Sequence, residues 1–206
     1  GTSTERPSPV QVVGLSGVAE IAAGGNHSLA RKSDGTVWSW GNNGSGQLGT
    51  GATSNVPLRV TAGAGTWRAI AAGYDHTCGI GYDTSLWCWG SNAGAQLATL
   101  DYTARAAPYN VDSVMGVPNR NSWAQVSCGY LTTCGTKASG MVFCWGTRTT
   151  GANGNYDPIY DTKAPAVIVA VQNTALDAVA VGDYATCATD VSYHPYIATP
   201  SGGGTE

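Results

Sequence analysis

Apolar residues along the chain either alternate with polar ones or gather in runs of four or five, and Gly, Pro, Asn and Asp bound these runs. This pattern is typical of short β-strands, and helical periodicity is nearly absent. Residues 70–92 (IAAGYDHTCGIGYDTSLWCWGSN) show the pattern most clearly. They predict a strand, a tight corner, a second strand, a turn and a third strand.

This stretch recurs along the chain. Related segments lie at 21–43 and 126–146, and a shorter one opens at 179–190. The corner glycines of the four copies are Gly24, Gly73, Gly129 and Gly182. A fixed order of strands at a period of roughly fifty residues is the signature of a repeat architecture.

Each of the first three copies is followed by a further short strand pattern, at 56–60, 107–111 and 166–169. Four short antiparallel strands without covering helices are typical of a propeller blade. We therefore predict an all-β fold, a β-propeller of about four blades, in a single domain spanning 1–206. Three units are full and the fourth is partial; they cover about 18–60, 67–111, 123–169 and 176–199.

Residues 7–13 (PSPVQVV) are predicted to be an outer strand that completes a blade. Within one molecule this strand could complete the fourth unit and close a small ring. Across molecules it could complete a blade of another chain by strand addition.

The composition and the missing motifs argue against several classes of function. Only 11% of residues are charged and the net charge is −3, so the chain lacks the basic stripe expected of a nucleic-acid partner. No apolar run is long enough to span a membrane. Phosphate loops, nucleophile elbows and paired carboxylates at repeated positions are also missing, so we predict a protein that is not an enzyme and needs no cofactor.

Histidine recurs at one position of the unit. His27 and His76 occupy a repeated His-Ser/Thr step, whereas the third and fourth units have Thr132 and Ala185 there. A metal site needs several converging ligands. We therefore interpret each histidine as a local hydrogen-bonding residue within its own blade and predict no metal.

The segment GGNHSLARKSDGTVWSWGNNGSGQLGTG closely resembles the regulator-of-chromosome-condensation repeat. The variant GYDHTCGIGYDTSLWCWGSNAGAQL resembles the cysteine-bearing form of secreted members. The resemblance implies a propeller, and members usually close a ring of seven blades. Repeats that normally splay for seven blades would need a much tighter turn per blade to close at four, so completion of a blade in another chain is preferred to a closed small ring. The resemblance also implies a binding or regulatory role, since some members inhibit β-lactamases and others exchange nucleotides on a small GTPase.

A plant ultraviolet-sensing member of that family carries tryptophans in the corner after the first strand. This chain has Gly25, Tyr74, Tyr130 and Asp183 there, so we do not expect a photoreceptor. The repeated Trp40, Trp89 and Trp145 precede a glycine on the third strand and are predicted to fill the core between blades.

The six cysteines divide into pairs. Cys78 and Cys88 are ten residues apart, as are Cys134 and Cys144, and the first unit lacks both cysteines of the pair. Opposed positions on antiparallel strands suit a disulfide, so we predict both bonds. Cys128 and Cys187 remain, and they could bridge the third and fourth units. Paired cysteines indicate an oxidising compartment, and hence an extracellular or cell-surface location.

The repeats also predict a binding surface, and the sequence contains two candidate glycosylation sites. The corners after the first strands should open on one face and form a binding surface, with its residues at Asn26, Tyr74, Asp75, Tyr130, Leu131, Asp183 and Tyr184. Alternatively, each tyrosine only caps its own blade. Asn26 and Asn43 both lie in N-glycosylation sequons, and Asn43, in a glycine-rich loop, is the preferred acceptor.

We predict an extracellular, non-enzymatic module for protein interaction or for structural or adhesive assembly. Its partners would be other protein chains, including copies of itself. The alternative function is a soluble inhibitor or regulator of a partner enzyme.

Overall fold

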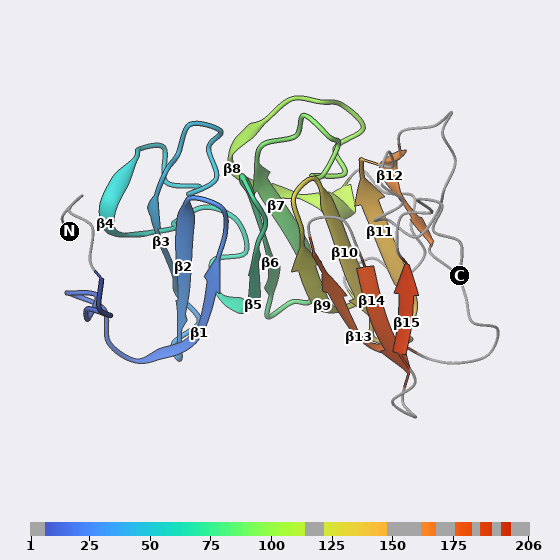
Figure 1. The fold of residues 1–206 in the computed structure, drawn as a ribbon, viewed down its shortest axis with the longest axis horizontal. Coiled ribbons are helices and arrows are strands. Elements are labelled where there is room, and N and C mark those ends of the chain that lie inside the picture. The colour runs from blue at the N-terminus through green and yellow to red at the C-terminus, as the bar shows by residue number, and fades with distance from the viewer. Residues whose placement is uncertain are drawn as a thin grey trace.

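The computed structural model describes residues 7–113, 122–147, 162–167, 176–182, 186–190 and 195–198. In this part of the chain the protein is almost entirely β-structure, with one short 3₁₀ turn at Val111–Ser113. The strands form four separate antiparallel sheets, and each sheet corresponds to one sequence unit (Figure 1). We call these sheets blades one to four.

Blades one to three have four strands each and blade four has three, always in sequential order. Blade one contains β1 (Val18–Ala23), β2 (His27–Lys32), β3 (Val37–Gly41) and β4 (Ser54–Arg59). Blade two contains β5 (Trp67–Ala72), β6 (His76–Gly81), β7 (Leu86–Gly90) and β8 (Arg105–Asn110). Blade three contains β9 (Trp123–Cys128), β10 (Thr132–Lys137), β11 (Val142–Gly146) and β12 (Thr162–Val167). Blade four contains β13 (Leu176–Val181), β14 (Thr186–Asp190) and β15 (Pro195–Ala198).

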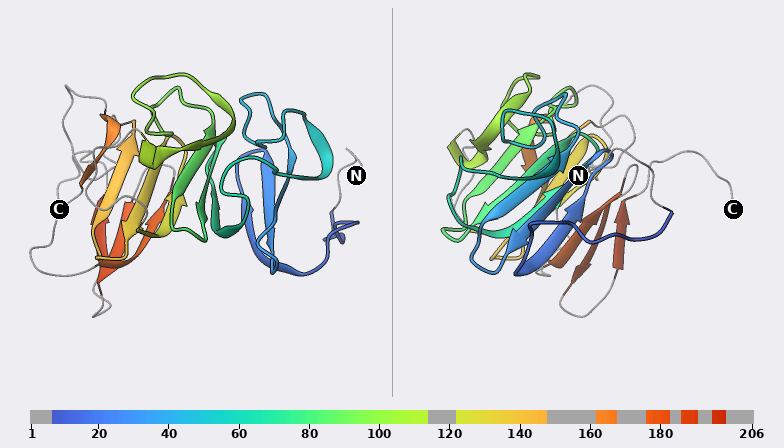
Figure 2. Two further views of the ribbon diagram at one scale, coloured as in Figure 1. Left: turned by 180° about the vertical axis from the view of Figure 1, so that it is seen from behind. Right: turned by 90° about the vertical axis from the view of Figure 1, so that its left-hand side faces the viewer.

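The blades follow one another in an open row. The first strands of neighbouring blades lie against each other, β1 beside β5, β5 beside β9 and β9 beside β13. Blade one lies at one end of the row, and blades three and four lie together at the other end (Figure 1 and the left view of Figure 2). The fold is therefore the predicted β-propeller type, but it is a partial propeller, and the alternative of a closed four-bladed ring is wrong.

The predicted outer strand at 7–13 is also absent, because residues 7–17 have no strand structure and the first strand begins at Val18. In this single chain the segment completes no blade. Pro7 and Pro9 have no backbone N–H, so two of the seven residues cannot donate to a strand ladder. Completion of a blade in another molecule stays a prediction.

Each complete blade ends its third strand with the same Trp-Gly step. The glycines Gly41, Gly90 and Gly146 have φ between 99° and 109°, a left-handed conformation that side chains disfavour. The register between the third and fourth strands shifts immediately before each of them. The step therefore re-aims the chain into the loop that leads to the outer strand.

The hydrophobic core lies between the blades. Trp67 and Trp89 pack with Leu29 and Ile70 in the junction of blades one and two. Trp123 and Trp145 pack with Cys78 and Leu97 in the next junction, between blades two and three. Trp89 and Trp145 are fully buried, as predicted, whereas their equivalent Trp40 is only partly buried. In the described part of the chain, no blade covers the side of blade one on which Trp40 lies.

Candidate binding face

The corners between the first and second strands are built alike in the first three blades. In each, the corner glycine donates its N–H to the carbonyl at the start of the second strand: Gly24 to His27, Gly73 to His76 and Gly129 to Thr132. Neighbouring corners are also linked, because the Gly25 N–H donates to Tyr74 O and the Tyr74 N–H donates to Gly129 O, both at 3.1 Å. The corners therefore form one continuous backbone rim.

Two tyrosines stand together on this rim. The rings of Tyr74 and Tyr130 lie with centroids 4.5 Å apart and planes tilted by 47°. Tyr74 is 40% exposed and Tyr130 is partly buried. A side chain added at Gly25 would meet the Tyr74 ring, so that ring lies across the corner of blade one as well. The pair therefore spans three blades and still offers aromatic surface to solvent.

The polar neighbours of the tyrosines are held in place. Asp75 accepts a hydrogen bond from Gln47 Nε2 at 3.0 Å, and its carbonyl accepts one from Ser91 N–H. Leu131 is partly buried and its carbonyl accepts from Thr147 N–H, while Asn26 is exposed. We call Asn26, Tyr74, Asp75, Tyr130 and Leu131 the corner face. The other two predicted members, Asp183 and Tyr184, lie outside the described residues.

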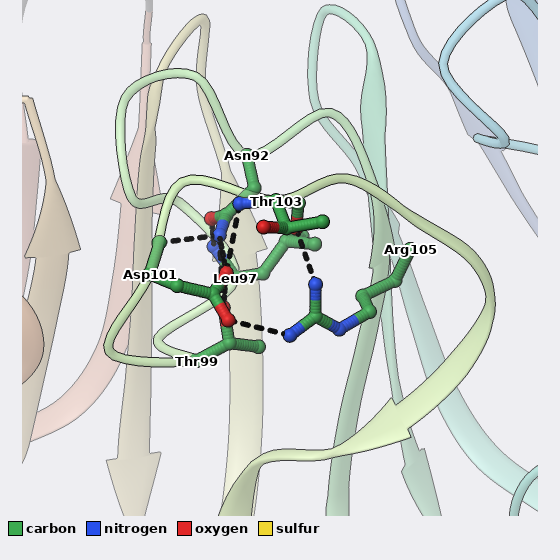
Figure 3. A network of polar contacts seen from close by, with 6 residues as sticks. All are labelled: Asn92, Leu97, Thr99, Asp101, Thr103 and Arg105. Atoms are coloured by element: carbon green, nitrogen blue, oxygen red, sulfur yellow. Dashed lines mark hydrogen bonds and ion pairs between the residues drawn. The ribbon is translucent and has the colours of Figure 1, made fainter.

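A polar network that sequence reasoning missed stabilises the β7–β8 loop (Figure 3). Asn92 Nδ2 donates to the Thr99 hydroxyl and to the Asp101 carbonyl, and Arg105 Nη2 donates to Asp101 Oδ2 at 2.7 Å. Partial desolvation raises the pKa of Asp101, but the hydrogen bonds from Arg105, Thr103 and Thr99 outweigh it and lower the pKa to about 2. Asp101 is therefore charged at any physiological pH.

Loop geometry explains why such a network is needed. Blade one has Gly46, Gly49 and Gly51 at positive φ in its β3–β4 loop, whereas the β7–β8 loop has Ala95, Ala98 and Leu100 at positive φ. A residue with a side chain is strained at positive φ, so the surrounding contacts must hold the loop in this conformation. The one sequence signal was Asn92, which echoes Asn43: each Asn Oδ1 accepts the N–H of a downstream leucine, Leu97 or Leu48.

This use of Asn43 changes the interpretation of the sequons. Asn43 is partly buried and its side chain fastens the loop, whereas Asn26 is exposed on a corner. Asn26 is therefore the more accessible of the two acceptors, contrary to the preference drawn from the sequence. Glycosylation of either stays a prediction.

The predicted disulfide positions face each other directly. Cys78 pairs with Cys88 across β6 and β7, and Cys134 pairs with Cys144 across β10 and β11. In both pairs the Cα atoms are 4.1 Å apart and the sulfurs are bonded.

The predicted bridge from Cys128 to Cys187 is not formed. Cys128 is a free thiol whose side chain packs between blades two and three, whereas Cys187 lies on β14 in blade four. The Cys128 sulfur lies within 4.8 Å of the ligand atoms of His76 and Cys78. Cys78 is already engaged in a disulfide, and burial raises the pKa of the Cys128 thiol to about 12, so the thiol stays protonated.

The histidines join blades rather than acting locally. His27 Nε2 bonds Thr77 Oγ1 at 2.9 Å, and Thr77 Oγ1 donates to Gln47 O, which also accepts from Trp89 Nε1. The next junction repeats the arrangement with His76, Thr133, Gln96 and Trp145. At each junction, a threonine hydroxyl and a tryptophan indole N–H thus donate to the same glutamine carbonyl of the preceding blade. Burial lowers the pKa of His27 to about 4; burial and the nearby His27 lower that of His76 to about 3.

The repeats match a known family. The regulator of chromosome condensation (RCC1) repeat matches residues 34–80, and a second description of the same repeat matches 18–47, 67–96 and 123–155. Together these matches cover more than half of the chain. The chain belongs to the RCC1 repeat family.

Individual relatives agree with this assignment. The Arabidopsis thaliana ultraviolet-B receptor UVR8 is 32% identical over 187 residues, which cover 88% of this chain and 41% of UVR8. Human WBSCR16 superposes with a TM-score of 0.75 at 23% identity, covering 87% of this chain and 47% of WBSCR16. Yeast RCC1 (Prp20), solved with Kap60 bound, has a TM-score of 0.72 at 18% identity, over 87% of this chain and 43% of Prp20. The chain therefore spans less than half the length of these relatives.

Among the described residues, no helix has both the length and the apolar character needed to cross a membrane.

Proposed function

We propose that this chain is a non-enzymatic protein-interaction module that binds a protein partner through the corner face. The observation that carries the proposal is the Tyr74–Tyr130 pair, whose rings are in contact and partly exposed and lie on a hydrogen-bonded backbone rim. Tyrosine offers a large contact area at low conformational cost and is enriched among residues that dominate binding energy. The related fold of Prp20 was solved with a protein, Kap60, bound to it.

Alanine substitution of the tyrosines tests this role. Tyr74→Ala and Tyr130→Ala should each weaken binding of the native partner by roughly 30-fold, the loss of about 2 kcal/mol expected at a dominant contact. The chain itself would serve as bait in its native source. Tyr82→Ala is the matched control, because Tyr82 is also exposed but lies in the β6–β7 turn, at the opposite end of the blade. A genuine partner is retained by Tyr82→Ala and lost by the two corner variants.

The competing explanation is that the tyrosines only support their blades. Under that explanation Tyr74→Ala lowers the melting temperature while partner binding by the folded protein is unchanged. Measuring melting and binding on the same variants therefore separates the two roles.

We further propose an extracellular or cell-surface location. The bonded pairs Cys78–Cys88 and Cys134–Cys144 support it, because such bonds persist in oxidising compartments. Peptide mapping of the native protein without reductant tests the proposal. Free thiols at these four positions would contradict it.

In that setting the module serves structural or adhesive assembly, contacting other protein chains. The alternative is a soluble inhibitor or regulator of an enzyme. Purification in the native state distinguishes them: co-migration in a large assembly supports the first, and a one-to-one complex with an enzyme supports the second.

A further inference from the structure

The free thiol of Cys128 lies against a disulfide of the neighbouring blade. Cys128 ends β9 in blade three, whereas the Cys78–Cys88 bond joins β6 to β7 in blade two. The sulfurs of Cys128 and Cys78 lie within 4.8 Å of each other, and Cys128 packs against the core cluster that contains both bonded cysteines. The Cys128 thiol is also in hydrogen-bond contact with the Cys78 backbone and the Thr133 side chain. The junction between blades two and three therefore holds a thiol and a disulfide side by side.

The strands of this junction direct the two sulfurs toward each other. Side chains two residues apart on a strand point to the same side. Cys78 therefore faces blade three as His76 does, and His76 Nε2 bonds Thr133 Oγ1 across the junction at 2.8 Å. Thr133 and Cys128 are direct partners on β10 and β9, so their side chains lie on the same side of blade three. The His76–Thr133 bond thus holds β6 against β9 beside the two sulfurs.

The other two junctions lack this arrangement. Cys128 is the last residue of the first strand of its blade, and the same position is Ala72 in blade two and Val181 in blade four. Val181 packs against the cluster of Cys134 and Cys144, so the second disulfide faces a hydrocarbon side chain. In the described part of the chain, only the junction between blades two and three brings a free thiol to a disulfide.

We propose that Cys128 is an exchange partner of the Cys78–Cys88 disulfide, so that the chain interconverts between a bond within blade two and a bond between blades two and three. Cys128 Sγ loses its proton and attacks Cys78 Sγ, which forms the Cys78–Cys128 bond while the Cys78–Cys88 bond breaks. Cys88 Sγ leaves with the electron pair of that bond and takes up a proton. One disulfide and one thiol are present before and after the step, so it needs no oxidant or reductant.

The surroundings of Cys128 keep this exchange slow at neutral pH. Burial raises the pKa of the Cys128 thiol to about 12, and only the thiolate is a nucleophile. Well below the pKa the thiolate fraction grows about tenfold for each unit of pH, and the rate of exchange grows with it. The bond within blade two therefore persists at neutral pH, and the bond between blades is reached faster as the pH rises.

The alternative bond would act close to the corner face. Cys128 lies two residues before Tyr130 and, together with Tyr74 and the corner glycines, lines a cavity of about 380 Å³. The Cys78–Cys88 bond ties two strands of one blade, whereas a Cys78–Cys128 bond ties β6 to β9. It would therefore join the two blades that carry the tyrosines covalently.

Replacing Cys88 by serine in the full chain tests the pairing. Cys88→Ser leaves Cys78 and Cys128 as neighbouring thiols, and glutathione disulfide supplies the oxidant. A Cys78–Cys128 bond should then form at least about tenfold faster than any protein disulfide of Cys134 in the matched control Cys144→Ser, where Cys134 faces Val181. Peptide mapping without reductant, with fragmentation of the linked peptides, identifies the bonds.

The unsubstituted chain tests the exchange itself, whether or not Cys88→Ser folds. The protein is held without oxygen or added thiol at pH 7, 8 and 9, quenched in acid, and its free thiol is alkylated and located by mass spectrometry. The label should move from Cys128 to Cys88, about tenfold faster per pH unit and at a rate independent of protein concentration. In Cys128→Ser no label should appear on Cys88 at any pH.

Three outcomes would overturn the proposal. The first is a folded Cys88→Ser protein in which Cys78 and Cys128 stay unbonded to each other in glutathione disulfide. The second is a parent chain that keeps its label on Cys128 at pH 9. The third is a label on Cys88 that appears equally in Cys128→Ser or rises with protein concentration, because another thiol or another molecule would then be the attacking group.

Discussion

At the scale of single residues, the hydrogen bonds at each junction determine which nitrogen of the histidine ring carries the proton. The Thr77 hydroxyl has a single hydrogen and donates it to Gln47 O, so it must accept from His27. His27 therefore carries its proton on Nε2, and Nδ1 is bare, buried and without a hydrogen-bond partner. The same holds for His76 and Thr133. Protonating either ring would place a charge and an unpaired N–H in the core.

This arrangement predicts a loss of stability in mild acid. The folded-state pKa values, about 4 for His27 and about 3 for His76, lie below the ordinary 6.5, so the unfolded chain binds more protons. Stability should therefore fall as the pH drops below about 6.5, by up to about 1.4 kcal/mol per pH unit for each histidine. Urea unfolding between pH 7 and pH 5 measures this. His27→Gln combined with His76→Gln should flatten the profile; an unaltered slope would contradict the assignment.

At the scale of the element, the Trp-Gly step controls how each blade turns. Asp75 O, in the corner, accepts the N–H of Ser91, and this bond brings Gly90 against the corner backbone. A Cβ on Gly90 would lie 2.6 Å from Asp75 O, at a φ of 99°. Glycine is thus required twice, for its conformation and for the close approach.

Alanine should destabilise the protein more at Gly90 than at a glycine that has open space around it. Gly51 also has positive φ, 79°, but nothing lies within 4 Å of its missing Cβ. Gly51→Ala should cost only the left-handed strain, about 1–2 kcal/mol. Gly90→Ala should cost that amount and an additional loss from the backbone clash, for roughly 3 kcal/mol or more in total. Equal midpoints of denaturation for the two variants would rule out the close approach as the cause.

At the scale of the whole molecule, the blades form an open row whose first face is uncovered. The chain covers only 41% of UVR8, 47% of WBSCR16 and 43% of Prp20. The row is held by neighbour-to-neighbour junctions, so its stability should be close to a sum of blade and junction terms. A segment that takes part in no junction should contribute little to it.

Deletion of residues 1–16 tests this view. Residues 7–16, the described part of the segment, have no strand, and Gly17 is kept because its carbonyl accepts from Ser33 N–H. The melting temperature should change by less than about 2 °C, which corresponds to under 1 kcal/mol at this length. Differential scanning calorimetry at two protein concentrations is the measurement. A drop of 5 °C or more would show that the segment is a structural part of the fold.

Much of the fold could be predicted from the sequence because its signals are local. Strands show themselves by alternation over a few residues, and the repeat shows itself by comparison of the chain with itself. The propeller class and the family were confirmed on this basis. The opposed positions of Cys78 and Cys88 could be predicted for the same reason, since a hairpin pairs residues that are near in sequence.

Contacts between blades were decided only by the tertiary structure, because they join residues roughly fifty positions apart that no local pattern links. The bond from His27 to Thr77 and the place of Cys128 in the second junction belong to this class. So does the state of residues 7–13, whose strand-like pattern pairs with no strand in the described part of the chain. The sequence alone determined the strands of each blade and their order. Packing determined which faces are covered and left Trp40 and Ile21 at the open one, because burial depends on a neighbouring blade.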